Sequence, residues 1–592
     1  MNVQHFLYCT ALHIFCVIEV VCLLTSCNDD ANYNIHSHQA QVSFLEKGVS
    51  VEIEECPEEY EICVGERLRN PYHIEVMREA YRIITDLGFW QYSVNTPKEE
   101  PLINAFYYRV LPSNYEELRI LLSDENVIYS DVPFDYQIDS DCGSYYMDPE
   151  CPSDTIIWLY AVIPHTYPLP EVGTAEVQVL DILHIPEEIE PVQYGEIDGI
   201  GMLEYLAYKL TGNLDEWEEE DIDFYENFFS GIEEGTNTFS KRNKSRAGLF
   251  AKTYPTGTMR VYNTDKNSLE AIEGVQVCMH NFGKRCSVIT DSDGKYASTV
   301  PFRTKVRYSI RFYNEQTKTC ILPTFPIVGP AYHRLGRHSK IGLDYDCYTN
   351  SKAWRYATIN NVLIKNLAFN DEYDIPTPEH LNIWVIGHKN ETWAGSTPLL
   401  HSYSGAYAGV AFGVLFCTGL PLLAVFLPDI LLFEEQDENA TTSELTETMF
   451  HELVHASHYL QVGDTYWDHY ISHIIWNQGY GDSEDSGYFA GYCGIGEMWA
   501  TYVGLFYLAK DLGFPILSQI EAPYWTCEQW FKPCIMIEIG NRIHDSDANI
   551  GNMYRSLQSD VHDLHALQWR MEREGINSDI IDDAISIYGR WN

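Results

Sequence analysis

The chain has 592 residues, a formal net charge of −48 at pH 7 and 14% aromatic residues. So large a negative charge argues against nucleic acid and anionic membrane surfaces as partners, because like charges repel. The 45% share of hydrophobic residues excludes a disordered acidic chain. The length suits three or four domains, and the acidity is expected to keep an exposed surface soluble.

The first 26 residues are predicted to be a secretion signal, because an apolar stretch runs from Phe6 to Leu24. It is followed by Leu24-Thr25-Ser26-Cys27, which resembles the bacterial lipobox. The resemblance implies cleavage before Cys27 and lipidation of its sulfur, with residues 27–41 as a polar tether. We therefore expect a protein of the cell envelope, periplasmic or surface-exposed, that contacts the outer membrane only through this lipid. A plain signal peptide and an uncleaved anchor are the alternatives.

Residues 42–250 show helical and strand patterns in an order typical of an α+β domain. No group of residues there indicates chemistry, so we interpret this region as a positioning or recognition module. Helices are predicted at 71–87, 115–122 and 200–212, and strands at 104–110, 127–132, 155–163 and 177–185.

Residues 256–345 contain short alternating runs separated by turn signals, a pattern typical of a β-sandwich. They resemble the carboxypeptidase regulatory-like (transthyretin-like) domains of secreted bacterial proteins. Asp291 and Asp293 precede Gly294, and we interpret them as an ordinary turn because no full calcium-loop spacing follows.

Twelve of the 16 cysteines lie beyond Cys27, an even number that predicts disulfides in an oxidising compartment. None has zinc-knuckle spacing, so no cysteine metal site is expected. The connectivity is not fixed by sequence. The pairs that we expect are Cys56/Cys63, Cys142/Cys151, Cys278/Cys286, Cys527/Cys534, Cys320/Cys347 and Cys417/Cys493.

Residues 405–427 carry no charge and are long enough to span a membrane. Because this stretch holds four glycines and Pro421, we favour buried strands or a Gly-rich loop over a span. A strand at 429–433 follows, and two helices between 552 and 591 are expected to complete the core. Residues 350–592 are thus predicted to be a mainly helical domain.

The sequence His451-Glu452-Leu453-Val454-His455 is the most informative motif of the chain. Histidines four apart on a helix emerge from one face, so that both can reach one Zn²⁺ at about 2.0–2.1 Å. Glu452 is placed to act as the general base toward a zinc-bound water. Thr441 and Glu444 predict a capping box for a helix over 441–462, with Thr442 and Ser443 as alternative caps. An amphipathic helix with two histidines on a polar stripe is the alternative.

The third ligand is predicted to be Glu497, on a second helix over 495–512. The positions that share its face, Ala500, Thr501 and Gly504, are small and would let the two helices approach closely. His458 lies about 10 Å along the axis from His451, too far to bind the same ion, so it is a residue of the cleft or an ordinary packed histidine. The fallback ligands are Asp482, Glu484 and Asp485.

At these residues the chain resembles the gluzincin metallopeptidases, which combine a His-Glu-x-x-His helix with a glutamate on a following helix. The resemblance covers roughly residues 350–592. It implies that His451, His455 and Glu497 bind one catalytic Zn²⁺, that Glu452 is the general base, and that a strand edge near the metal binds the substrate backbone. The residue that stabilises the transition state is left open. The candidates are His458, Tyr488, Tyr492 and Tyr502.

The expected function is therefore that of a lipid-anchored zinc peptidase acting on a peptide or protein substrate. The alternatives are a surface lipoprotein that binds glycan or protein through a zincin scaffold without peptidase activity, and a hydrolase of other amides or esters.

Overall fold

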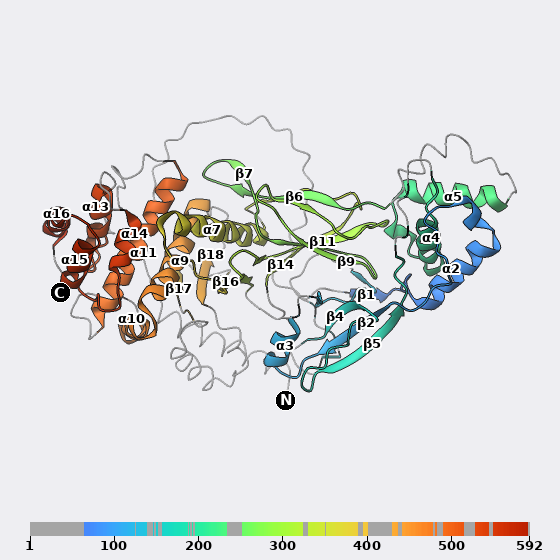
Figure 1. Cartoon of the computed structure of the whole chain (residues 1–592), viewed down its shortest axis with the longest axis horizontal. Coiled ribbons are helices and arrows are strands. Elements are labelled where there is room, and N and C mark those ends of the chain that lie inside the picture. The colour runs from blue at the N-terminus through green and yellow to red at the C-terminus, as the bar shows by residue number, and fades with distance from the viewer. Residues whose placement is uncertain are drawn as a thin grey trace. The chain divides into compact units, whose positions relative to one another are not determined.

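The structure is a computed structural model that describes most of the chain from Val64 to Gly589. Within this span it leaves out 123, 125, 139–145, 147, 149, 152–156, 188, 190–191, 193–195, 234–251, 324–329, 350, 389–394, 399, 401–428, 436–440, 478–479, 482–488, 514–526 and 544–548. The described residues form two compact units, which correspond to 61–365 and 366–592. The boundary falls within helix α7 (Lys352–Tyr373). The protein is multidomain, with a C-terminal helical region (Figure 1).

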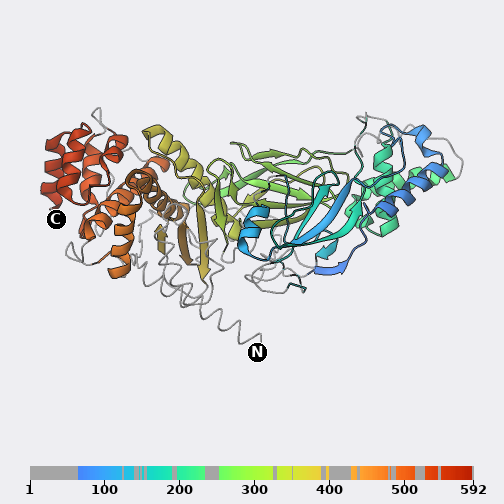
Figure 2. The ribbon, with the colours of Figure 1, turned by 60° about the horizontal axis from the view of Figure 1, so that its bottom comes forward.

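The first part of unit 61–365 mixes helices with a three-stranded antiparallel sheet, whose order is β4-β2-β5. These strands lie side by side in both views (Figures 1 and 2). Helix α2 forms because Ile74, Met77, Ala80 and Ile84 recur at helical spacing, and all four are buried. The elements are β1 (Val64–Arg67), α2 (Ile74–Asp86), η1 (Phe89–Tyr92), β2 (Ala105–Leu111), α3 (Tyr115–Leu122), β3 (Tyr136–Ile138), β4 (Leu159–Pro164), β5 (Glu176–Leu183), α4 (Gly199–Thr211), η2 (Leu214–Glu216) and α5 (Glu219–Glu233).

The strand predicted at 127–132 is wrong, because only Ser130 forms an isolated bridge there. The Ser130 hydroxyl donates to the carbonyl of Val132 and accepts from its amide. This local turn competes with strand pairing, and Pro133 offers no backbone donor.

The second part of unit 61–365 is rich in strands, as predicted. One sheet has the order β10-β6-β15 with β7 also on β6, and the other has the order β14-β11-β8-β9. Buried and half-buried residues alternate along β11, so one face of its sheet is a core face. The strands are β6 (Thr256–Asn263), β7 (Ser268–Ala271), β8 (Gln276–His280), β9 (Arg285–Ile289), β10 (Lys295–Ala297), β11 (Val306–Arg311), β12 (Tyr313–Asn314), β13 (Thr319–Leu322), β14 (Tyr332–His338) and β15 (Tyr345–Cys347).

The Asp291 segment is an ordinary turn. The carboxylate of Asp291 accepts from the amides of Asp293 and Lys295, and Gly294 has a φ of 72°. The side chain of Asp293 is paired with Lys295.

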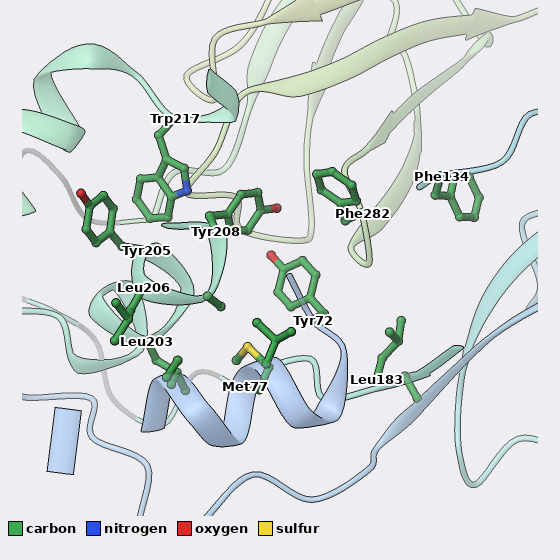
Figure 3. Packing of buried hydrophobic residues seen from close by; sticks show 14 of the residues in the cluster. Tyr72, Met77, Phe134, Leu183, Leu203, Tyr205, Leu206, Tyr208, Trp217 and Phe282 are labelled. Carbon is green, nitrogen blue, oxygen red and sulfur yellow. The ribbon is translucent and has the colours of Figure 1, made fainter. Parts of the chain in front are cut away.

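The helical and strand-rich parts of unit 61–365 share one core. Phe282, which lies between β8 and β9, packs edge-on against Tyr208, and Tyr208 in turn contacts the rings of Tyr72 and Trp217 (Figure 3). Beside this aromatic cluster, Glu204 accepts hydrogen bonds from Lys284 at 2.6 Å and from Arg303 at 3.0 Å. These charges are buried, so their pairing fixes how the two parts dock.

Of the predicted disulfides, Cys527–Cys534 is present. The pair Cys278/Cys286 is wrong, because the register places Met279 opposite Cys286 and therefore turns Cys278 to the other face of the sheet. Cys320 and Cys347 are not bonded to each other either. Each remaining predicted pair includes a cysteine outside the described residues, namely Cys56, Cys63, Cys142 or Cys417.

Unit 366–592 combines a small sheet with helices. Strand β18 pairs in parallel with β16 and antiparallel with β17, which is the last strand of this sheet among the described residues. Three helices, and not the two predicted, follow residue 549. The elements are β16 (Asn382–His388), β17 (Gly395–Pro398), β18 (Ile430–Glu435), α9 (Thr442–Val462), α10 (Asp464–Asn477), α11 (Ala490–Asp511), α13 (Cys534–Ile543), α14 (Ile550–Ser556), α15 (Leu564–Arg573) and α16 (Ser578–Tyr588).

None of the described helices combines the length and the apolar character that a membrane span requires. The uncharged stretch 405–427 lies outside the described residues.

Candidate metal centre

Helix α9 carries the motif and begins as predicted. The Thr441 side chain accepts from the amide of Glu444, and the Glu444 carboxylate accepts from the amide of Thr441, so the capping box is complete. The helix ends at Gly463, whose φ of 76° suits glycine. With no proline inside, the helix is continuous through the motif, so His451 and His455 lie one turn apart on one face.

Helix α11 packs directly against α9, and α10 packs against both. Helix α11 begins at Ala490, five residues earlier than predicted. Gly504 makes the close approach: a Cβ on it would lie 3.7 Å from the Cβ of His451. The small face predicted on this helix therefore faces the histidine helix.

The predicted ligands converge. The Nε2 atoms of His451 and His455 are 3.0 Å apart. The Glu497 carboxylate lies between them, with Oε2 3.3 Å from His451 Nε2 and Oε1 3.3 Å from His455 Nε2. Among the described residues, this is the only group of three or more His, Cys, Asp or Glu side chains compact enough to hold a metal ion.

The donor set fits a metal ion. Ligand atoms about 2.0–2.1 Å from a tetrahedral zinc lie about 3.3–3.4 Å from one another. Here the two imidazole nitrogens are 3.0 Å apart, and each lies 3.3 Å from a different oxygen of Glu497. Two imidazoles and one carboxylate also leave one position of a tetrahedron open, as catalytic zinc sites do.

The charges of the site are coupled. Burial lowers the pKa of His451, but its hydrogen bond to Glu497 and the charges of Glu497 and Glu452 outweigh burial and raise it to about 9. Burial raises the pKa of Glu497, and the two imidazoles together shift it well below its usual range. The carboxylate is therefore ionised and attracts a cation.

The cluster is reached from one side. The side chain of His451 is 21% exposed, whereas those of His455 and Glu497 are 1% and 2% exposed. Strand β17, the last described strand of its sheet, packs beside α9. Glu452, which follows the first histidine, is buried, and its charge acts on His451.

Tyr470 is a site residue that the sequence did not reveal. Its hydroxyl, on α10, donates a hydrogen bond to Oε1 of Glu497, and its ring stacks on Trp467. This contact orients the carboxylate toward the histidines. Trp467 and Tyr470 are three residues apart directly after α9, a spacing that by itself indicates only one face of a helix.

The other candidates lie elsewhere. His458 is fully buried against the rings of Tyr466 and Trp467, and burial together with the His455 charge lowers its pKa to about 3. Tyr492 packs on Tyr466, His469 and His562. Tyr502 is buried between Trp499 and Phe506.

None of these three side chains contacts the cluster through a described hydrogen bond, so the predicted stabiliser of the transition state stays unassigned. Tyr488 and the fallback ligands Asp482, Glu484 and Asp485 lie outside the described residues.

Comparison of the chain with protein-family models, with curated proteins and with solved structures finds no match.

Proposed function

We propose that unit 366–592 is a zinc-dependent peptidase. The observation that supports this proposal most strongly is the convergence of His451, His455 and Glu497, with Glu452 one residue after the first histidine. A glutamate at that position is needed for hydrolysis but not for holding a metal, which favours an enzyme over a binding scaffold.

His451, His455 and Glu497 would hold the ion. When bound, zinc supplies a Lewis acid that polarises the scissile carbonyl and lowers the pKa of a water molecule. Glu452 takes the proton of the attacking water onto its carboxylate and delivers it to the amine of the leaving peptide. Tyr470 keeps the Glu497 carboxylate turned toward the histidines.

The substrate would enter from the exposed side of His451. We propose strand β17 as the docking edge, because it ends the sheet within the described residues and an edge strand can pair its backbone with an extended peptide. We further propose that Cys27 is lipidated and holds the enzyme in the cell envelope, as the lipobox implies.

The test uses residues 28–592 as wild type, Glu452→Gln and His451→Ala, with zinc content and cleavage of a peptide library measured on each. We expect one zinc per chain in the wild type and in Glu452→Gln, and none in His451→Ala. Peptide cleavage should fall at least about 100-fold in Glu452→Gln, because the general base is lost while the metal stays.

Zinc-loaded wild type that cleaves no peptide would reject the peptidase, and amide and ester libraries would then separate another hydrolase from a binding protein. Removal of zinc by a chelator should abolish cleavage, and added zinc should restore it.

A further inference from the structure

The sheet β14-β11-β8-β9 has one unusual face. Side chains alternate between the two faces of the sheet along each strand. Val277, Met279 and Ile310 lie on the face that packs in the core, and the residues between them lie on the opposite face. This opposite set includes five arginines, which we call the arginine face. They are Arg285, Arg307, Arg311, Arg334 and Arg337.

Three of these arginines have carboxylate partners. Arg307 pairs with Glu216 at 3.1 Å, and Arg337 pairs with Glu216 and Asp215. Arg334 contacts both oxygens of Asp131, at 2.8 and 3.0 Å.

Arg285 and Arg311 are different. Within the described part of the chain, neither pairs with a carboxylate: Arg285 donates to the carbonyl of Ile128 and lies over the ring of Phe134, and Arg311 donates to the amide oxygen of Gln276. The Nε of Arg311 is buried and has no hydrogen-bond partner among the described residues. The arginine face thus carries two positive charges in excess of its three carboxylates.

The register makes these two arginines diagonal neighbours of one residue, Cys278. Cys278 pairs with Ser287 on β9 and with Ser309 on β11, so Arg285 and Arg311 lie on opposite diagonals across Cys278. Arg311 and Arg334 lie over the same Tyr332 ring, at 5.8 and 6.0 Å from its centroid. Burial and the repulsion from Arg311 both lower the pKa of Arg285.

Buried like charges without a counter-ion are costly, so such a cluster calls for an anion. The planar guanidinium fork matches the oxygens of a phosphate or sulfate group, and two charges balance the excess. We propose that the arginine face binds a doubly charged oxyanion, a phosphate or a sulfate, between Arg285 and Arg311. This site lies in unit 61–365 and does not depend on the proposed peptidase activity.

The test titrates residues 28–592 carrying His451→Ala with inorganic phosphate and with sulfate at constant ionic strength, by calorimetry. The His451→Ala background removes the metal cluster as a competing site. We expect saturable binding that weakens at least about tenfold in Arg285→Gln and in Arg311→Gln. The matched control is Arg307→Gln, which removes the same charge from a paired arginine of the same face and should weaken binding less than about threefold.

If the protein that keeps all five arginines binds neither phosphate nor sulfate at concentrations up to about 10 mM, the proposal is overturned. It is also overturned if Arg307→Gln loses as much affinity as Arg285→Gln and Arg311→Gln, because the anion would then respond only to the overall positive charge of the face. An absence of binding would also be the result if another segment of this chain occupied the face. Methyl phosphate separates two sources: equal affinity indicates a phosphate group on a larger molecule, and loss of affinity indicates the free ion.

If a glutamine variant fails to fold, the chain that keeps all five arginines decides the question. Phosphate should then slow phenylglyoxal modification of Arg285 and Arg311, read by peptide mass spectrometry, and leave the rate at Arg307 unchanged. No protection would overturn the site.

Discussion

Gly504 of α11 touches His451 of α9, with only 3.7 Å between the position of a Cβ on the glycine and the Cβ of the histidine. The two helices can approach this closely because the position has no large side chain. A methyl group at 3.7 Å makes ordinary contact, whereas a larger side chain would push α11 and its Glu497 away from the histidines.

Gly504→Ala should therefore keep zinc binding and stabilise the helix by about 0.5–1 kcal/mol. Gly504→Leu should weaken zinc binding at least about tenfold, since a metal site requires its ligands within a few tenths of an ångström. Competition with a zinc chelator measures both variants, and circular dichroism shows whether the helices persist. Equal zinc affinity in the two variants would contradict this account.

Tyr470 should control how well Glu497 binds the metal. Tyr470→Phe removes the hydroxyl that donates to Glu497 but keeps the ring on Trp467, so we expect zinc affinity to fall about 10–100-fold with the fold intact. Tyr466→Phe, one turn earlier on α10, is the control, because its hydroxyl donates to the carbonyl of Tyr492. If both variants bind zinc like the wild type, the hydrogen bond does not orient the ligand.

The cluster of His451, His455 and Glu497 could be predicted because local rules decide it. The capping box at Thr441 and the stop at Gly463 define α9, and the spacing of four puts both histidines on one face. Glu497 could be found because small residues on its helix face indicate a close neighbour. These signals lie within single helices, so they can be read without knowing the tertiary structure.

Other features depend on how distant segments meet. Tyr470 reaches Glu497 only through the packing of α10 against α11, which periodicity does not specify. The pair Cys278/Cys286 failed because proximity in sequence says nothing about the one-residue register that turns side chains to opposite faces. The arginine face needed both the register of four strands and the carboxylates of another region.

His333 on β14 should make unit 61–365 sensitive to acid. Burial, together with the Arg334 charge, lowers its pKa to about 4, compared with about 6.5 in an unfolded chain. The unfolded state therefore takes up a proton first as the pH falls, and stability present above pH 6.5 is lost between pH 6.5 and 4. For this group the loss by pH 5 is about 2 kcal/mol.

His333→Gln should remove this part of the pH dependence, so the stability difference between wild type and variant should change by about 2 kcal/mol between pH 7.5 and pH 5. Hydrogen exchange of β14 peptides measures it on the whole chain. His338→Gln, at the exposed end of the same strand, is the control for loss of a histidine. If the stability difference between wild type and His333→Gln is the same at pH 7.5 and pH 5, His333 has the same pKa in the folded and the unfolded protein.

Glu204 should hold the two parts of unit 61–365 together. Its oxygens accept from Lys284, Arg303 and Tyr72, so Glu204→Gln leaves two buried cations with one carboxylate fewer. Breaking such a pair costs about 3–5 kcal/mol, because the remaining charges stay buried. Hydrogen exchange should then become faster in α4 and in β8 together, since the network joins both parts.

Glu226→Gln is the control, because its partner Lys209 is 41% exposed and a surface pair contributes at most about 1 kcal/mol. Faster exchange in α4 alone would show that the strand-rich part folds without the helical part.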